Sequence, residues 1–183
     1  LAFTFLLSIF SPPIRAQGFG VESKSAPSVV GAGTYVSLQG RFSIALPQQH
    51  HGFRGLSIPT PNGNATGDSY EWRMKEGAFN AGYVDAAQPL DEPETSKGVF
   101  AGVREKLEQL AKDSGGKLVS EKQIDLNKHQ GRELRVEFFT GLVIYRVYLV
   151  SGRLYQVAAM LKYDQQANEE IAVNVLDSFK ILN

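Results

Sequence analysis

The sequence contains no cysteine, and this absence removes several kinds of protein at once. Disulfide-stabilised scaffolds, thiolate zinc sites, iron–sulfur clusters and cysteine nucleophiles all need that residue. The chain also lacks an excess of either charge, because its 183 residues include 19 basic and 19 acidic side chains. Since a protein that binds the phosphates of nucleic acids normally carries a basic excess, we expect no nucleic-acid partner.

Sequence motifs of catalysis are equally scarce. The chain has three histidines, in none of the H-E-x-x-H or H-x-H spacings that hold a metal, and it has no phosphate loop and no G-x-S-x-G segment. Its composition, 43% hydrophobic and 21% charged, is typical of a globular chain that can bury a core. We therefore expect a protein that is not an enzyme and that holds no cofactor.

The N-terminal segment is strongly apolar. Residues 1–10 read LAFTFLLSIF, and Pro12-Pro13 and then Ala16 follow them. An apolar run, a break and a small residue are typical of a secretory signal peptide, so we predict that residues 1–16 are such a leader, without its charged start, cleaved after Ala16. Ten residues span about 15 Å as a helix, too little for a bilayer core of about 30 Å. We expect no transmembrane span in the mature chain, with an uncleaved longer anchor as the alternative.

The remainder divides into a linker and one domain. Residues 17–33 are rich in Gly, Ser, Ala and Pro, which predicts a flexible linker, and residues 34–183 read as a single domain. After cleavage the chain keeps a net charge near zero, and it has no cysteine for a lipid anchor. The sequence therefore predicts an exported protein, periplasmic or extracellular and monomeric, whose partner is an unidentified protein or small molecule.

Hydrophobic periodicity in the domain predicts strands arranged in hairpins, with two helices. In residues 132–140 the apolar side chains of Leu134, Val136 and Phe138 share one face, whereas residues 142–150 are apolar on both faces. A central strand of that kind needs cover on both sides, so we predict an α+β fold: an α/β/α sandwich around a mostly antiparallel sheet. The predicted strands are 35–38, 42–46, 70–75, 79–85, 117–126, 132–140, 142–150 and 153–161, and the predicted helices are 95–113 and 165–179. The apolar stripe that each helix should bury is Val99, Val103, Leu107 and Leu110 in the first and Ile171, Val175 and Phe179 in the second.

One interior stretch shows no periodic pattern. Residues 47–67 contain three prolines and four glycines. Such composition predicts a long loop, either mobile or functional, because long loops without regular structure are uncommon in compact domains.

The C-terminal half resembles a known family in the order of its segments. A strand opened by GREL at 131–134 is followed by YRVYLV at 145–150, by GRLYQV at 152–157 and by a final helix that ends in VLDSFK at 175–180. Together with the early strand FSIALP at 42–47, this order resembles the PsbP-like family, which comprises extrinsic photosystem II proteins and exported bacterial relatives. The resemblance implies an α/β/α sandwich, export (into the thylakoid lumen in a phototroph) and a binding or accessory role.

Adjacent histidines form the one candidate metal site. His50 and His51 lie in the 47–67 stretch, and with a carboxylate such as Asp68 they could bind Zn²⁺ or Cu²⁺. The alternative is a pair of solvent-exposed loop histidines, because neighbouring imidazoles converge on one metal only where the backbone turns sharply. A metal-dependent hydrolytic enzyme is the corresponding alternative function.

Arg146 is a cation inside an otherwise apolar strand, so it needs either a partner or a route to solvent. We considered two interpretations: an anchor for an anionic ligand, and pairing with Glu133 or Glu137 across the hairpin. These two glutamates share a strand face about 13 Å apart, farther than the carboxylate pair of a glycosidase, and with Arg135 between them they predict a solvated charge ladder.

Three aromatic residues complete the set of candidates. Trp72, Tyr83 and Tyr155 lie on predicted strands, where packing in the core is the usual role of aromatic side chains. The alternative is a pocket between sheet and helix, lined by these residues and used by a small-molecule carrier. The sequence thus predicts an exported, non-enzymatic binding or accessory domain, with Arg146, Trp72, Tyr83 and Tyr155 as the candidate ligand or partner surface.

Overall fold

The structure is a computed structural model, and it describes residues 33–46, 52–60, 63–74, 77–86, 89–90, 92–162 and 169–182. A seven-stranded sheet occupies its centre, and every neighbouring pair of strands is antiparallel. The strands, in the spatial order β3-β4-β5-β9-β8-β7-β6, are β3 (Gly52–Thr60), β4 (Gly63–Met74), β5 (Gly77–Asp85), β9 (Arg153–Lys162), β8 (Gly141–Val150), β7 (His129–Phe138) and β6 (Lys117–Leu126).

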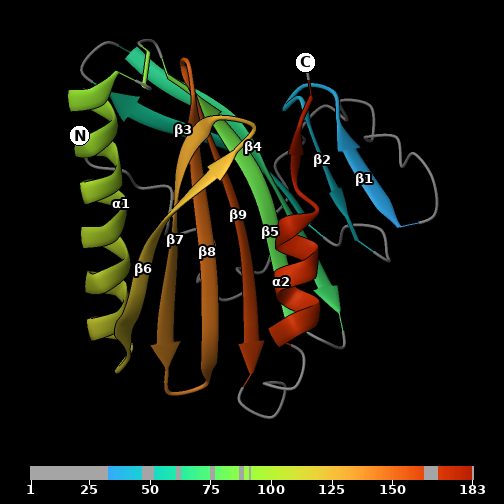
Figure 1. Ribbon diagram of the computed structural model, residues 1–183, viewed down its shortest axis with the longest axis vertical. Helices are drawn as coiled ribbons and strands as arrows, with labels where there is room; N and C mark the ends of the chain where they lie inside the picture. Colours follow the sequence, from blue (N-terminus) through green and yellow to red (C-terminus); the bar gives the residue numbers. More distant parts are fainter. Residues whose placement is uncertain are drawn as a thin grey trace, which may run out of the picture.

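One face of this sheet is covered by the long helix α1 (Pro93–Asp113) (Figure 1). Proline at the first helical position fits the start of a helix, because its missing N–H has no partner there in any case. Val99, Val103 and Leu107 are buried as predicted, against Leu134, Val136 and Phe138 of β7. The helix ends at Ser114, after which Gly115 adopts a left-handed φ of +70°.

The opposite face is covered by α2 (Glu169–Asp177) and by a small sheet of β1 (Thr34–Ser37), β2 (Phe42–Ala45) and β10 (Lys180–Ile181). Figure 1 shows α2 and the small sheet side by side, away from α1. Their core with the large sheet is rich in aromatic side chains, which include Tyr35, Phe42, Trp72 and Phe179. The predicted α+β sandwich around an antiparallel sheet is therefore confirmed, and the small sheet adds to it.

Two predictions about local structure were wrong. The 47–67 stretch is not a single loop, because residues 52–60 form the edge strand β3 and β4 already begins at Gly63. In α2 the buried face consists of Ala172, Val175 and Leu176, whereas Ile171, expected to be buried, is 44% exposed. Within the described residues, no helix has the length and apolar character needed to cross a membrane.

Candidate functional site

The three residues of the candidate metal site are only partly within the described structure. His50 and His51 lie outside the described residues. Asp68 is on β4, where its Oδ2 accepts a hydrogen bond of 2.7 Å from the hydroxyl of Tyr83. Among the described residues no three His, Asp or Glu side chains gather closely enough to hold a metal. Asp68 therefore has a structural partner, and its metal role stays a prediction.

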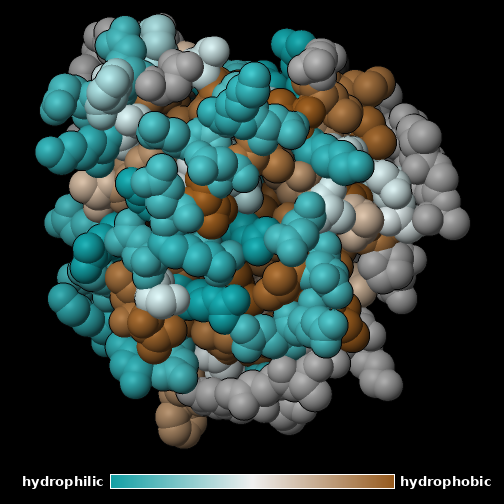
Figure 2. Space-filling model, in the orientation of Figure 1, coloured by the Kyte–Doolittle hydropathy of each residue, from teal (hydrophilic) through white to brown (hydrophobic). Residues whose placement is uncertain are grey.

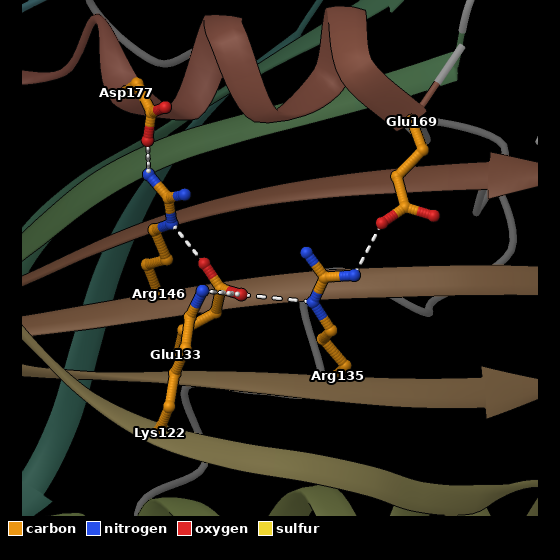
Figure 3. A network of polar contacts seen from close by, with 6 residues as sticks. All are labelled: Lys122, Glu133, Arg135, Arg146, Glu169 and Asp177. Atoms are coloured by element: carbon orange, nitrogen blue, oxygen red, sulfur yellow. Dashed lines mark hydrogen bonds and ion pairs between the residues drawn. The ribbon is translucent and has the colours of Figure 1, made fainter. Parts of the chain in front are cut away.

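Arg146 belongs to a network of charged groups on the α2 face of the sheet (Figure 3). Its direct cross-strand neighbour is Glu133, and Arg146 Nε donates to Glu133 Oε2 at 2.7 Å. Glu133 Oε1 also accepts a hydrogen bond from Arg135 Nε at 3.0 Å and forms an ion pair with Lys122 Nζ at 3.1 Å. Pairing of Arg146 with Glu133 across the hairpin, one of the two interpretations of the sequence, is thus confirmed.

The same network holds α2 against the sheet. Arg146 Nη1 donates to Asp177 Oδ1 at 2.6 Å, at the last residue of α2. Arg135 Nη1 donates to Glu169, at the first residue of that helix. Because the two arginines reach opposite ends of α2, they fix both its position and its direction on the sheet. We call these six residues the α2 clamp: Lys122, Glu133, Arg135, Arg146, Glu169 and Asp177.

Glu133 is the buried centre of the α2 clamp, and this corrects the prediction of a solvated charge ladder. Its side chain is 1% exposed, whereas Glu137 of the same strand face is 39% exposed. Burial alone would raise the pKa of Glu133, but hydrogen bonds from Arg146, Arg135 and Lys122 outweigh it and lower that pKa. Glu133 is therefore held as an anion, which suits an anchor.

The three candidate aromatic residues are buried. Trp72, Tyr83 and Tyr155 are 0%, 1% and 2% exposed and pack in the core between the large sheet, α2 and the small sheet. The guanidinium of Arg153 lies over the ring of Tyr83, 4.4 Å from its centre, and pairs with Asp85. Core packing of the aromatic residues, the usual role, is confirmed, and a ligand could reach them only if neighbouring side chains moved.

A surface hollow that the sequence analysis did not anticipate lies at one end of the large sheet. Because the sheet is antiparallel, β4, β7 and β9 end there while β5 and β8 begin there. Figure 1 shows the β7–β8 turn and the end of β9 together at the lower end of the molecule. The hollow has a volume of about 980 Å³, and we call it the sheet-end groove; its lining residues are Arg73, Met74, Gly77, Ala78, Ser114, Phe138, Phe139, Thr140, Gly141, Val143, Met160, Leu161 and Lys162.

Two glycines on the lining of the sheet-end groove allow close packing of the strands there. Gly77 is the first residue of β5, which lies between β4 and β9. Gly141 is the first residue of β8, which lies between β9 and β7. A Cβ at Gly141 would lie 1.8 Å from the carbonyl oxygen of Leu161, and one at Gly77 would lie 2.6 Å from that of Met160. Only glycine permits so close an approach of the β9 backbone at these two positions.

The lining of the groove combines apolar groups with two cations. Both methionines of the chain, Met74 and Met160, are part of it. Phe139 stands in the two-residue β7–β8 turn with 85% of its surface exposed, although such turns favour Asn, Asp or Gly. Arg73 and Lys162 are exposed, and none of the described lining residues is acidic. Neither the fold nor the turn explains an aromatic side chain so exposed.

A row of polar side chains lies beside the groove on the α1 face of the sheet. The Tyr145 hydroxyl donates to Gln156 at 2.8 Å, Gln156 Nε2 to Asn80 at 3.0 Å, and Asn80 Nδ2 to Ser69 at 2.7 Å. A small hollow at Asn80 shares Ala78, Val143 and Met160 with the sheet-end groove. These polar groups thus satisfy one another across four strands.

Hydrophilic side chains cover most of the face seen in Figure 2, and apolar side chains reach the solvent in separate patches between them. Among the residues that the structure describes, Leu38, Phe53 and Phe139 are the most exposed large apolar residues, at 77%, 55% and 85%. Of these, only Phe139 lines the sheet-end groove. Single exposed apolar residues are ordinary on protein surfaces, but one beside an apolar hollow indicates a binding site.

Comparison with known proteins gives a likeness of fold. No protein-family profile matches the sequence, and no curated protein matches it either. Among solved structures, cyanobacterial PsbP (CyanoP) from Synechocystis sp. PCC 6803 superimposes with a TM-score of 0.55 at 15% identity, over 86% of this chain and 98% of that one. A protein of unknown function from Pseudomonas aeruginosa, PA94, gives a TM-score of 0.43 at 12% identity, over 79% and 92%. The chain therefore has a PsbP-like fold.

Proposed function

We propose that this protein is an exported accessory domain that binds a partner and catalyses no reaction, and that the sheet-end groove is its binding site. The observation that carries the proposal is the exposed Phe139 beside an apolar groove of about 980 Å³. Binding sites are typically concave, mostly apolar and edged by a few polar groups. The predicted leader supports export, and the PsbP-like fold supports an accessory role.

The charged groups of the described residues support binding over catalysis. A general acid or base works best when its pKa lies near the pH at which it operates. The most deeply buried carboxylate, Glu133, has its pKa shifted away from neutrality by three cations. It is thereby suited to hold α2 in place and poorly suited to transfer protons.

An apolar dye tests the proposal without knowledge of the partner. We expect Nile red, which is uncharged, to fluoresce when added to the purified protein and to lose most of that signal in Phe139→Asp. Leu38→Asp is the matched control, because Leu38 is similarly exposed but does not line the groove. Equal loss of dye binding in both variants, or in neither, would contradict the groove as the binding site.

A further inference from the structure

We infer that the sheet-end groove receives an amphipathic helix of a partner protein, with apolar side chains on one face and carboxylates beside them. This inference rests on the proposed function and names the chemistry of the partner. It follows from three properties of the groove: the position of its strands in the sheet, the nature of its apolar lining and the sign of its charges.

The position of the strands excludes recognition by strand addition. In the order β3-β4-β5-β9-β8-β7-β6, each of the strands β4, β5, β9, β8 and β7 that contribute to the groove has a neighbour on both sides. Their backbone groups are already paired in the sheet, so an added strand would find no row of free N–H and C=O groups. A partner must therefore be recognised through its side chains, as a helix in a groove is.

The apolar lining fits side chains of varied shape. Met74 and Met160 are half-buried, and methionine adapts to irregular surfaces because its side chain is unbranched and its sulfur is polarisable. Val143 packs with Met160 in the core on the α1 side of the sheet, and Leu161 packs with Met74 in the core on the α2 side; both are almost fully buried, at 1% and 0% exposed. Phe139 at the mouth offers a large aromatic surface of the kind that dominates binding energy at interfaces.

The charges of the groove favour an acidic partner. Arg73 has 64% of its side chain exposed, and Nε donates to Glu71 Oε1 at 2.7 Å, which keeps the guanidinium at this end of β4. Lys162, the last residue of β9, is also exposed. Arg73 and Lys162 are the charged residues among the described lining, so carboxylates beside the apolar face of a helix would meet cations there, while Glu71 of the adjoining small hollow is paired with Arg73.

The size and openness of the groove favour a peptide over a small ligand. Its volume of about 980 Å³ is at the upper limit for small-molecule pockets, about 300 to 1,000 Å³. Arg73, Phe139 and Lys162 on its lining are all exposed, so the groove opens to solvent and does not enclose its ligand. An acyl chain is the alternative occupant, and it forms a separate arm of the test.

Both methionines of the chain line the groove, Met160 from the α1 side of the sheet and Met74 from the α2 side, so their methyl groups serve as probes of its occupancy. We would label them with ¹³C in the purified protein, assign them with Met74→Leu and Met160→Leu, and titrate two helical peptides of about 18 residues, or five turns. Both peptides share a Leu and Phe face, which is bordered by Glu in one and by Lys in the other. We expect both methyl resonances to shift with the Glu peptide, which binds at least about tenfold more tightly than the Lys peptide.

Charge reversal separates recognition from a merely structural role. Lys162→Glu should weaken the Glu peptide about tenfold and strengthen the Lys peptide, a reversal that loss of folding cannot produce. Lys97→Glu, on the exposed face of α1 and outside the groove, is the matched control and should change neither affinity. Phe139→Ala should weaken both peptides.

The outcomes distinguish this inference from the proposed function. If Nile red binds at Phe139 but neither peptide shifts the methionine methyls, the amphipathic-helix inference is overturned and the groove remains a binding site. If palmitate shifts both methyls while the peptides do not, the occupant is an acyl chain and the inference is again overturned. If neither dye, peptide nor palmitate binds, the proposed function fails as well.

Discussion

The α2 clamp and the sheet-end groove differ in how completely their side chains find contact partners within the protein. In the clamp, each arginine donates to two carboxylates and the central Glu133 receives three cations. In the groove, an 85% exposed phenylalanine stands beside an apolar lining with space for a further molecule. The comparison teaches that a dense charge pattern can be wholly used by the fold, and that apolar surface left uncovered by the fold is the better guide to a binding site.

The largest expected effect comes from a substitution that removes Glu133, the centre of the α2 clamp. Glu133→Ala leaves the guanidinium of Arg146, itself only 8% exposed, without its main partner, so we expect a loss of about 3 to 5 kcal/mol in the free energy of unfolding. Urea denaturation measures it. Glu137→Ala, on the same strand face but 39% exposed, should cost under about 1 kcal/mol. Similar losses in the two variants would contradict the central role of Glu133.

A smaller effect is expected where β8 begins. Gly141→Ala places a Cβ 1.8 Å from the carbonyl oxygen of Leu161, so β9 must shift, and we expect a loss of about 1 to 3 kcal/mol together with weaker dye binding in the groove. Gly98→Ala is the control, because its Cβ on α1 would meet nothing within 4 Å and alanine favours a helix. Unchanged stability and dye binding in Gly141→Ala would argue against the packing described at the groove.

Acid should act on the clamp and leave the groove unaffected. Because the pKa of Glu133 is lower in the folded chain, its contribution to stability is present above the ordinary pKa of glutamate, about 4.3, and is lost as the pH falls through the depressed folded-state value. We expect the stability difference between the native protein and Glu133→Gln to shrink as the pH is lowered from about 6 to about 3. A difference that stays constant over that interval would show that Glu133 does not titrate as described.

The smallest effect on stability is expected at the groove. Phe139 is exposed and lies in a turn that does not need it, so Phe139→Ala should change the free energy of unfolding by less than about 0.5 kcal/mol. The same variant should lose most of its Nile red binding. A loss of stability comparable to that of Glu133→Ala would mean that Phe139 serves the fold, and the contrast between the two regions would disappear.

The sequence predicted those parts of the fold that periodicity encodes. The alternation in β7 correctly placed Leu134 and Val136 on one face, because residues two apart on a strand share a face, and the structure shows that this face packs against α1. It could not reveal that Glu133 is buried, since that depends on α2, whose Glu169 is far along the chain from Arg135. A charged strand face is usually solvated, and only the packing of a distant helix made this one an exception.

Edge strand β3 and the sheet-end groove escaped prediction for related reasons. Residues 52–60 include glycine and proline, which are depleted in strands, and they become a strand through pairing with β4. The groove is formed by turns that only the antiparallel topology brings to one end. Its signals in the sequence were Gly141 at the start of an apolar strand and Phe139 in the turn before it, where an aromatic residue has no role in folding.

The small sheet also bears on when the protein becomes folded. β2 pairs with β1 from the start of the domain and with β10 from its end, and Phe42 of β2 packs on Phe179, beside β10. During synthesis the N-terminal hairpin appears long before the segment that completes it. Its aromatic side chains must stay without some of their final neighbours until Phe179 and β10 have been made. The small sheet therefore cannot be complete before β10 has been synthesised, and the aromatic core beneath it closes late in folding.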